Sequence, residues 1–453
     1  MRGQGASRGF FRLTGRGGKR HNLGFLTKQT TQKNFTGRWS TAGGFLLDTL
    51  PIAVVALLVL HLIRAHLLDN YIVPSGSMEP ALHGDPEQGD LVLVDKTAFW
   101  GRRLPERLDL VVLRDPADPT GDHLVKRLVA WGDQNKGGEF IQIRSGDLYI
   151  GREKHEMTRL VKDPVEHRNL RVTHFLFPDP LETRDPETYF HAQSGWSRQG
   201  EAIKLSAAAA DIEGLSGMLT PAANQARRSE RGRYWLPGHL GTARPVDASF
   251  VDAAGKFHPG DGLFRDIGME LDLVLDEGWT GLQCVLEYHD DDYSFTLTPD
   301  GEARFFFMGA VALPVKRVVL SGPRVQIAFG YMDGHLFFVV GGRKVFHFAS
   351  DLTKEDALDY RMHNLLHAAV AGAGAKVERV RLFHDVHYRS LLAGPDGWGE
   401  PHHVEPGQLW LLGDNASGSR DSRHLGPYPS HHLVGRPVAI LRPASRRRWL
   451  GPR

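Results

Sequence analysis

The chain contains one cysteine, Cys284, among its 453 residues. A single cysteine excludes an internal disulfide framework and any metal site built from several thiolates. Charge of one sign is not in excess either, because the formal net charge is only +2. The protein as a whole is therefore not expected to attract nucleic acid, and we predict no nucleic-acid partner. We also predict no cofactor and no metal.

Acidic residues are absent from the first 40 positions, which carry nine lysines and arginines. A segment with this composition is expected to be disordered. A basic arm either binds nucleic acid or marks the cytoplasmic flank of a membrane segment, and the residues that follow decide between the two.

A dense apolar run follows at residues 43–68 and includes Leu50–Leu60. As a helix of about 20 residues it can just cross about 30 Å of hydrocarbon. A cleaved signal peptide and a buried core helix are alternatives, but the long basic lead favours an uncleaved anchor. We therefore predict a single-pass protein of the cytoplasmic (inner) membrane that contacts lipid, with residues 1–42 in the cytoplasm and the remainder on the external face.

Length and composition indicate several β-rich domains. A chain of 453 residues is too long for one ordinary core, and 51 glycines with 26 prolines favour many turns. Short apolar runs at residues 89–96, 108–113 and 123–130 read as strands.

The stretch Pro74-Ser-Gly-Ser77 is a candidate catalytic turn. Gly76 has no Cβ and permits a sharp turn, so Ser75 and Ser77 can lie on one side of it. Taken alone, a Ser-Gly-Ser sequence is far more often an ordinary turn.

Lys126 lies between Leu124 and Leu128 on one face of the strand expected at residues 123–130. If that face is buried, loss of hydration lowers the pKa of the ammonium group, and a lysine then becomes a base near neutral pH. A solvated lysine on an edge strand is the alternative.

A polar loop at residues 413–423 follows an apolar strand at residues 409–412. It contains Ser419, and it contains Asp421 and Arg423, whose ion pair would hold the loop in one shape. A lysine base needs a hydroxyl group that orients its nitrogen toward the nucleophile. The loop is therefore a candidate for the third part of a site.

Together these segments resemble the bacterial type I signal peptidases, membrane-bound endopeptidases with a Ser/Lys dyad. The similar segments, in the family's order, are Pro74-Ser-Gly-Ser-Met-x-Pro80, Gly89-Asp-Leu-Val-Leu-Val, Lys126-Arg127, and Gly413-Asp-Asn with Ser419-x-Asp421-Ser-Arg423. The chain departs from the family at Ala416-Ser-Gly418 and Ala130-Trp-Gly-Asp133. The resemblance covers roughly residues 43–165 and 386–453.

The resemblance implies a role for each matching residue. Ser77 would be the nucleophile and Lys126 the general base, while the Ser75 hydroxyl and the Ser77 amide would form the oxyanion hole. Ser419 would orient Lys126, and Asp421 with Arg423 would form a structural pair. Substrates would be signal-peptide-bearing preproteins, bound as a strand beside Val73, Pro74, Leu82, Leu124 and Val125.

An insert interrupts this pattern. Residues 166–256 read as irregular structure, whereas alternating apolar residues at 257–385 suggest a β-sandwich, with a hairpin at Asp333-Gly334. This part looks like the concanavalin-like jelly-roll modules, and its ligand, a glycan or a protein, stays open. The acidic sequence Asp290-Asp-Asp292 could hold calcium, but an ordinary acidic hairpin tip is favoured, and we assign no metal.

The expected fold is mainly β: a basic arm, a transmembrane anchor and a signal-peptidase-like antiparallel β domain, interrupted by the insert. The peptidase domain would comprise residues 69–165 and 386–453. The favoured function is an endopeptidase that removes signal peptides from exported preproteins. The alternatives are an anchored binding protein on a degenerate peptidase scaffold, and a self-cleaving Ser/Lys repressor, which would need a DNA-binding domain in place of the anchor.

Overall fold

The computed structural model describes residues 42–450 with internal gaps. The chain divides into two compact units, Met1–Val59 and Leu60–Arg453, each described by itself. The expected basic arm lies outside the described residues except for Ala42. The gaps are 104, 117–122, 134–135, 179–189, 193–195, 200–201, 206–238, 243–249, 252–256, 259–265, 289–290, 309, 351–363, 373 and 389–398.

The apolar run forms a helix, α1 (Ala42–Leu62), which continues as a π-helical turn, η1 (Ile63–Leu67). Its 18-residue stretch Leu50–Leu67 has a mean hydropathy of 2.1 and none of it is buried. By length and composition this helix can cross a membrane. The expected mainly β class with one N-terminal apolar helix is confirmed.

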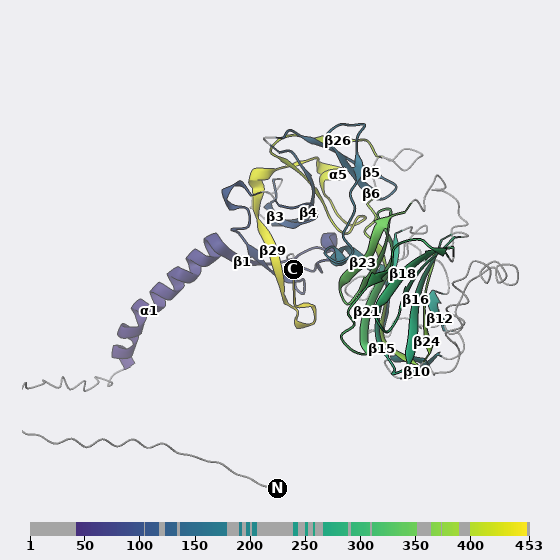
Figure 1. Cartoon of the computed structure of the whole chain (residues 1–453). Helices are drawn as coiled ribbons and strands as arrows, with labels where there is room; N and C mark the ends of the chain where they lie inside the picture. The colour runs from purple at the N-terminus through teal and green to yellow at the C-terminus, as the bar shows by residue number, and fades with distance from the viewer. Residues whose placement is uncertain are drawn as a thin grey trace, which may run out of the picture. The chain divides into compact units, whose positions relative to one another are not determined.

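Strands from both ends of the second unit form one eight-stranded sheet. Its order is β1-β2-β29-β3-β4-β27-β28, with β30 paired to β29, and Figure 1 shows β29, in yellow, beside β3 and β4. Strand β3 is buried on both faces, since Val112 packs in one apolar cluster and Val111 in another. The strands are β1 (Leu68–Ile72), β2 (Leu91–Asp95), β3 (Leu110–Arg114), β4 (His123–Trp131), β27 (Gln408–Leu412), β28 (Tyr428–Pro429), β29 (Leu433–Arg442) and β30 (Arg448–Trp449).

A smaller sheet follows β4, with the order β26-β5-β6-β7. It again joins a C-terminal strand to N-terminal ones, because β26 pairs with β5. Its strands are β5 (Glu139–Arg144), β6 (Asp147–Gly151), β7 (Thr158–Arg159) and β26 (His402–Val404).

The insert forms two packed eight-stranded sheets, drawn largely in green in Figure 1. One apolar cluster that includes Leu271, Leu282 and Phe295 draws on both sheets, so their inner faces share a core. The first sheet contains β8 (Arg171–Phe177), β10 (Trp196–Gln199), β11 (Ala202–Leu205), β15 (Ile267–Leu275), β21 (Arg324–Met332), β22 (His335–Val340), β23 (Arg343–Ala349) and β25 (Ala375–Asp385). The second contains β9 (Phe190–Ala192), β12 (His239–Thr242), β16 (Trp279–Tyr288), β17 (Asp291–Leu297), β18 (Glu302–Phe307), β19 (Ala310–Val311), β20 (Lys316–Arg317) and β24 (Asn364–Gly372). The strands β13 (Phe250–Val251) and β14 (Phe257–His258) pair with each other.

In residues 166–256, where irregular structure with few strands was expected, the described residues include the short strands β8 to β13. Strand β8 pairs with β25, β11 pairs with β25, and β12 pairs with β24. These short strands lack a clear alternation of their own, and partners more than a hundred residues away supply their hydrogen bonds. The hairpin expected at Asp333-Gly334 is confirmed, since Met332 pairs with His335 and both turn residues have positive φ.

The two ends of the insert lie side by side. Arg171 at the start of β8 pairs with Asp385 at the end of β25. Beside them, Lys162 Nζ lies 2.6 Å from Asp333 Oδ1 and 2.5 Å from Asp385 Oδ2, and all three residues are buried. A buried ion cluster therefore joins the segment after β7 to the insert.

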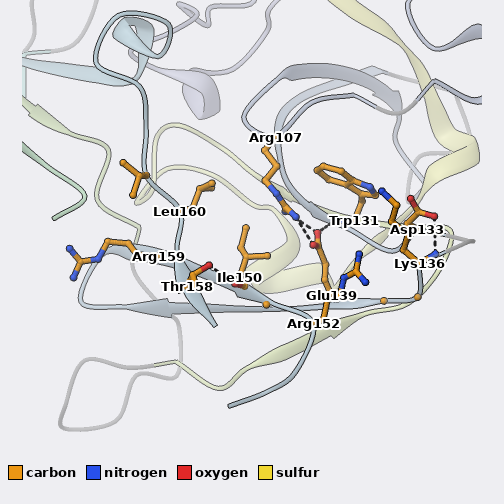
Figure 2. Close-up of a pocket in the computed structure, with 14 residues that line it drawn as sticks. Arg107, Trp131, Asp133, Lys136, Glu139, Ile150, Arg152, Thr158, Arg159 and Leu160 are labelled. Atoms are coloured by element: carbon orange, nitrogen blue, oxygen red, sulfur yellow. Dashed lines mark hydrogen bonds and ion pairs between the residues drawn. The ribbon is translucent and has the colours of Figure 1, made fainter. Parts of the chain in front are cut away.

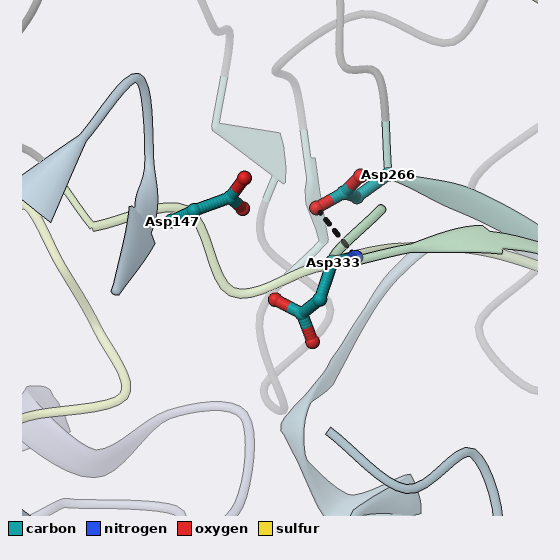
Figure 3. Close-up of side chains that lie close together, drawn as sticks. All are labelled: Asp147, Asp266 and Asp333. Atoms are coloured by element: carbon teal, nitrogen blue, oxygen red, sulfur yellow. Dashed lines mark hydrogen bonds between the residues drawn. The ribbon is translucent and has the colours of Figure 1, made fainter. Parts of the chain in front are cut away.

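Two further carboxyl groups extend this cluster. Oxygen atoms of Asp147, Asp266 and Asp333 lie within 4.8 Å of one another, and Figure 3 shows their side chains converging. Burial, and then the other carboxylates, raises the pKa of Asp147 and of Asp266, and burial raises that of Asp385 to about 7. These groups hold protons to a higher pH than surface aspartates do, which limits the negative charge at the junction.

Candidate active site

The nucleophile candidate lies on a 3₁₀ turn, η2 (Gly76–Met78), just after β1. Ser75 is extended, and its Oγ lies 3.3 Å from Ser77 Oγ. A Cβ on Gly84 would come within 1.7 Å of the Ser75 carbonyl oxygen, so only glycine allows the chain to pass so close behind the turn. Buried Met78 fixes the other side. The turn is rigid, and it presents two hydroxyl groups together.

Lys126 reaches this turn from β4. Its Cα pairs with that of Val111, and its side chain lies in a buried environment, with the residue only 3% exposed. Its Nζ lies 3.0 Å from Ser77 Oγ. Burial lowers the pKa of Lys126 below its ordinary value, against the attraction of Asp421 and Asp414. The arrangement brings a hydroxyl and a desolvated amine into hydrogen-bond contact.

The loop at residues 413–423 closes over the turn from the C-terminal part of the chain. Asn415 Nδ2 donates to the Gly76 carbonyl oxygen at 3.0 Å, and the Asn415 backbone N–H donates to that of Ser77 at 3.2 Å. A Cβ on Gly413 would come within 2.1 Å of Ser419 Oγ and 2.5 Å of the backbone carbonyl oxygen of Ser77. The loop is therefore fitted tightly against the nucleophile turn.

Asp421 and Arg423 form a buried ion pair, with Asp421 Oδ2 2.8 Å from Arg423 Nη2. Asp421 also accepts from the Gly413 backbone N–H at 2.9 Å and caps the short helix α5 (Ser422–Leu425). These bonds, with burial opposing them, hold the pKa of Asp421 below its ordinary value. The pair fixes both ends of the loop.

Ser419 is buried in this loop and lies close enough to Asp421 to help lower the pKa of that carboxyl group, but no hydrogen bond joins its Oγ to Lys126 among the described residues. Its orienting role toward Lys126 stays a prediction. Among the residues expected to contact substrate, Val73 and Leu82 have side chains in the core, whereas Pro74 is exposed and Leu124 and Val125 are partly buried. Val73 also uses both of its backbone groups, toward Asp90 and Asp85.

A second buried ion pair stands directly beside the dyad and had no role in the sequence interpretation. Arg127 Nε and Nη2 donate to the two carboxylate oxygens of Asp414 at 2.6 and 2.5 Å. Arg127 Nη1 also donates to the Leu108 carbonyl oxygen at 2.5 Å. Both residues belong to the matching motifs, Lys126-Arg127 and Gly413-Asp-Asn. Their presence in these motifs is the sequence feature that could have pointed to the pair. The pair joins β4 to the end of β27.

We expect Asn415→Ala to lower kcat about tenfold with little change in KM, because it loosens the nucleophile turn without touching the substrate. The backbone N–H of residue 415 keeps its bond to Ser77. Steady-state cleavage kinetics on a short peptide measure this, with exposed Arg420→Ala in the same loop as the control. A raised KM with unchanged kcat would instead make Asn415 a substrate-binding residue.

A hollow of about 410 Å³ lies near the other end of β4 (Figure 2). Arg107 stacks on Trp131, its guanidinium carbon 4.4 Å from the ring centre, and bonds Glu139 at 2.9 and 2.5 Å. Trp131 is five positions from Lys126, about 17 Å along the strand. None of the predicted site residues lines this hollow, so it is separate from the dyad.

The two parts of the chain that carry Ser77, Lys126 and Asp421 match a known family. The model of the family "Signal peptidase, peptidase S26" matches residues 46–194 and 360–441, about half of the chain. The chain belongs to this signal peptidase family, and its family domain is split around the insert.

Curated relatives agree with the family. Signal peptidase I T of Bacillus subtilis (strain 168) is 33% identical over 120 residues, covering 26% of this chain and 56% of that protein. Signal peptidase I of Bacillus licheniformis is 30% identical over 127 residues, covering 28% of this chain and 56% of that protein. The chain thus spans about half the length of the curated relatives it matches.

Solved structures show only a faint likeness. A Bacillus licheniformis beta-glucanase aligns at a TM-score of 0.29 and 10% identity, covering 47% of this chain and 98% of that chain. A beta-1,3-glucanase from Mycobacterium marinum aligns at a TM-score of 0.25 and 10% identity, covering 46% and 98%. Values this low carry no argument about the insert, whose likeness to concanavalin-like modules stays a prediction.

Proposed function

We propose that this protein is a membrane-bound serine endopeptidase that cleaves N-terminal signal peptides from exported preproteins. The observation that carries the proposal is the 3.0 Å contact between Lys126 Nζ and Ser77 Oγ, made by a buried lysine in a chain of the signal peptidase family. A hydroxyl nucleophile needs an adjacent base, and desolvation makes a lysine amine available as that base.

In the proposed mechanism neutral Lys126 accepts the Ser77 proton while Ser77 Oγ attacks the scissile carbonyl carbon. The Ser77 amide and the Ser75 hydroxyl stabilise the oxyanion, and the leaving amine takes the proton from Lys126. The resulting acyl-enzyme is hydrolysed by water that gives its proton to the same lysine, and Lys126 then returns a proton to Ser77 Oγ as the acyl group leaves. The mature protein leaves in the first step and the signal peptide in the second.

The preprotein's cleavage region would bind as an extended strand beside Pro74 and the strand that carries Leu124 and Val125. By family resemblance, small residues would precede the cut at the first and third positions. Helix α1 would anchor the enzyme in the inner membrane with the catalytic part outside. Eight residues separate Leu68 from Ser77, so at about 3.5 Å per residue the dyad would act within about 30 Å of the bilayer.

The rate should rise with pH until Lys126 is neutral. Burial lowers the pKa of Lys126. As the pH rises, the protonated and inactive form should therefore be lost before the pH reaches the ordinary lysine pKa of 10.5. Asp421→Asn removes a charge that raises this pKa, and it should move the acid limb of kcat/KM to lower pH. Measuring kcat/KM against pH for both proteins tests this, and an acid limb near 10.5 in the parent enzyme would contradict it.

The direct test is cleavage of a model preprotein by the full chain in detergent. We expect one cut, located by mass spectrometry, after a small residue, and loss of cleavage when that residue is replaced by a bulky one. Intact preprotein after prolonged incubation with folded enzyme would reject the endopeptidase and favour a binding protein on this scaffold.

A further inference from the structure

Four arginines surround one buried glutamate in the first sheet of the insert. Glu270 on β15 is 2% exposed. Its carboxylate accepts from Arg168 at 3.0 and 2.7 Å, from Arg379 at 3.2 Å, and from Arg171. Arg381 Nη1 lies 3.5 Å from the same group. The arginines come from η4 (Arg168–Leu170), β8 and β25, so the cluster exists only in the folded insert.

This cluster lies on the face of the sheet that points away from the second sheet. Along β15, Leu271 and Leu273 belong to the core shared by the two sheets. Glu270 and Asp272 alternate with them and therefore point to the opposite face. Their partners across the sheet are Arg381 and Arg379.

Among the described residues bonded to Glu270 and Asp272, positive charge exceeds negative charge. The second carboxylate there, Asp272, lies 3.8 Å from Arg379 Nη1 and accepts from Gln326 at 2.8 Å. Four arginines against two carboxylates leave an excess of two positive charges. Burial lowers the pKa of Arg381 to about 10, against the attraction of Glu270 and with the repulsion of the neighbouring arginines.

Two of the arginines, buried Arg171 and partly buried Arg381, are bonded within the insert, whereas the side chains of the other two are exposed to solvent. Arg381 donates to Thr173 Oγ1 and to the Arg171 carbonyl oxygen at 2.9 and 2.7 Å, and Arg171 stacks on the Phe383 ring at 4.4 Å. By contrast, the side chains of Arg168 and Arg379 are 42% and 38% exposed.

The two exposed guanidinium groups are held close together. Arg168 Nη2 and Arg379 Nη2 both lie within 3.2 Å of Glu270 Oε2, so these nitrogens are at most about 6 Å apart. Arg168 uses Nε and Nη2 for Glu270, and its Nη1 has no bond to any other described residue. Glu270 lies between these like charges and offsets one of them, so a second anion would stabilise the pair further.

We propose that Arg168 and Arg379 form a binding site for a doubly charged oxyanion of the phosphate or sulfate class. Planar guanidinium groups donate pairs of hydrogen bonds to such oxyanions, and one dianion balances the two excess charges. Buried Glu270 acts as the internal counter-ion that sets the spacing of the two donors. The oxyanion is either a free ion or an ester group on a polymer. This site is distinct from the Ser77 region and does not rest on the peptidase function.

Titration calorimetry on the full chain in detergent tests the site, with inorganic phosphate and soluble polyphosphate as separate probes in a chloride buffer. We expect at least one probe to bind, and we expect Arg168→Gln and Arg379→Gln each to weaken it about tenfold or more. Binding of inorganic phosphate identifies a free ion, and binding of polyphosphate alone identifies a polymer.

The matched control is Arg324→Gln on neighbouring β21, whose side chain is 76% exposed and pairs with Glu378 at 3.3 Å. It should change the affinity by no more than about twofold, since exposed pairs contribute little. Arg379→Lys keeps the charge but loses the planar fork, and it should bind less tightly than the parent. Absence of binding by both probes, or equal losses in Arg379→Gln and Arg324→Gln, would overturn the proposal.

Discussion

Ser77→Ala and Lys126→Ala should each lower cleavage of a signal-peptide substrate by at least about 10⁴-fold, because nucleophile and base act as one unit. For the same reason the double variant should be no slower than either single one. Ser77→Ala removes a partly exposed hydroxyl, and Lys126→Ala removes a buried amine that has lost part of its hydration. Both proteins should therefore fold, and circular dichroism checks this.

Two companion variants make this test specific. Ser75→Ala should lower the rate on the order of a hundredfold, since it removes one of two proposed oxyanion donors. Lys136→Ala changes an exposed lysine in the turn that follows β4 and should leave the rate unchanged. Turnover of a folded Lys126→Ala protein within tenfold of the parent would remove Lys126 as the base.

Breaking the Arg127–Asp414 pair should destabilise the eight-stranded sheet that contains β4 and β27 more than any surface change. Arg127→Met leaves the Asp414 carboxylate buried without its bidentate partner, and such losses cost about 3–5 kcal/mol in the free energy of unfolding. Both side chains are at most 2% exposed, so water cannot replace the missing donors. Hydrogen exchange of the β4 and β27 amides measures the effect locally, apart from unfolding of the insert.

The double variant Arg127→Met/Asp414→Leu separates a lost partner from a lost interaction. Replacing both members by apolar residues removes the unpaired charge, so most of the stability should return. Arg324→Met, in an exposed pair with Glu378, should cost less than about 1 kcal/mol. If the double variant exchanges as fast as Arg127→Met alone, the destabilisation comes from packing and not from the unpaired carboxylate.

The local patterns of the sequence predicted the elements that depend on neighbouring residues. The apolar run at α1 and the alternation in β15 and β21 correspond to elements in the structure, as does the Asp333-Gly334 turn. Strands β8, β11 and β12 escaped prediction, because their stability comes from pairing with β24 and β25, which follow much later in the chain.

The same limit applies to the sites. Lys126 was noticed as a lysine between two leucines, and Ser77 was identified by the resemblance of the motifs taken in order. The sequence interpretation gave no role to Arg127 and Asp414, since a bond across 287 positions has no local pattern. The carboxyl cluster around Lys162 and the arginines around Glu270 were missed for the same reason: each is assembled from several strands, and no single segment carries its charge excess.

The position of β29 in the sheet that contains β2, β3 and β4 has a consequence for how the protein is made. Strands β2 and β3 are neighbours in sequence, yet β29 lies between them in the sheet. At about 5–20 residues per second, a ribosome needs on the order of tens of seconds to reach β29 after it has finished β2. The insert is synthesised within that interval and can fold while the first sheet still has an open gap. The sheet that carries Lys126 is completed only after β29 has been made, so a chain that stops before β29 lacks the assembled site.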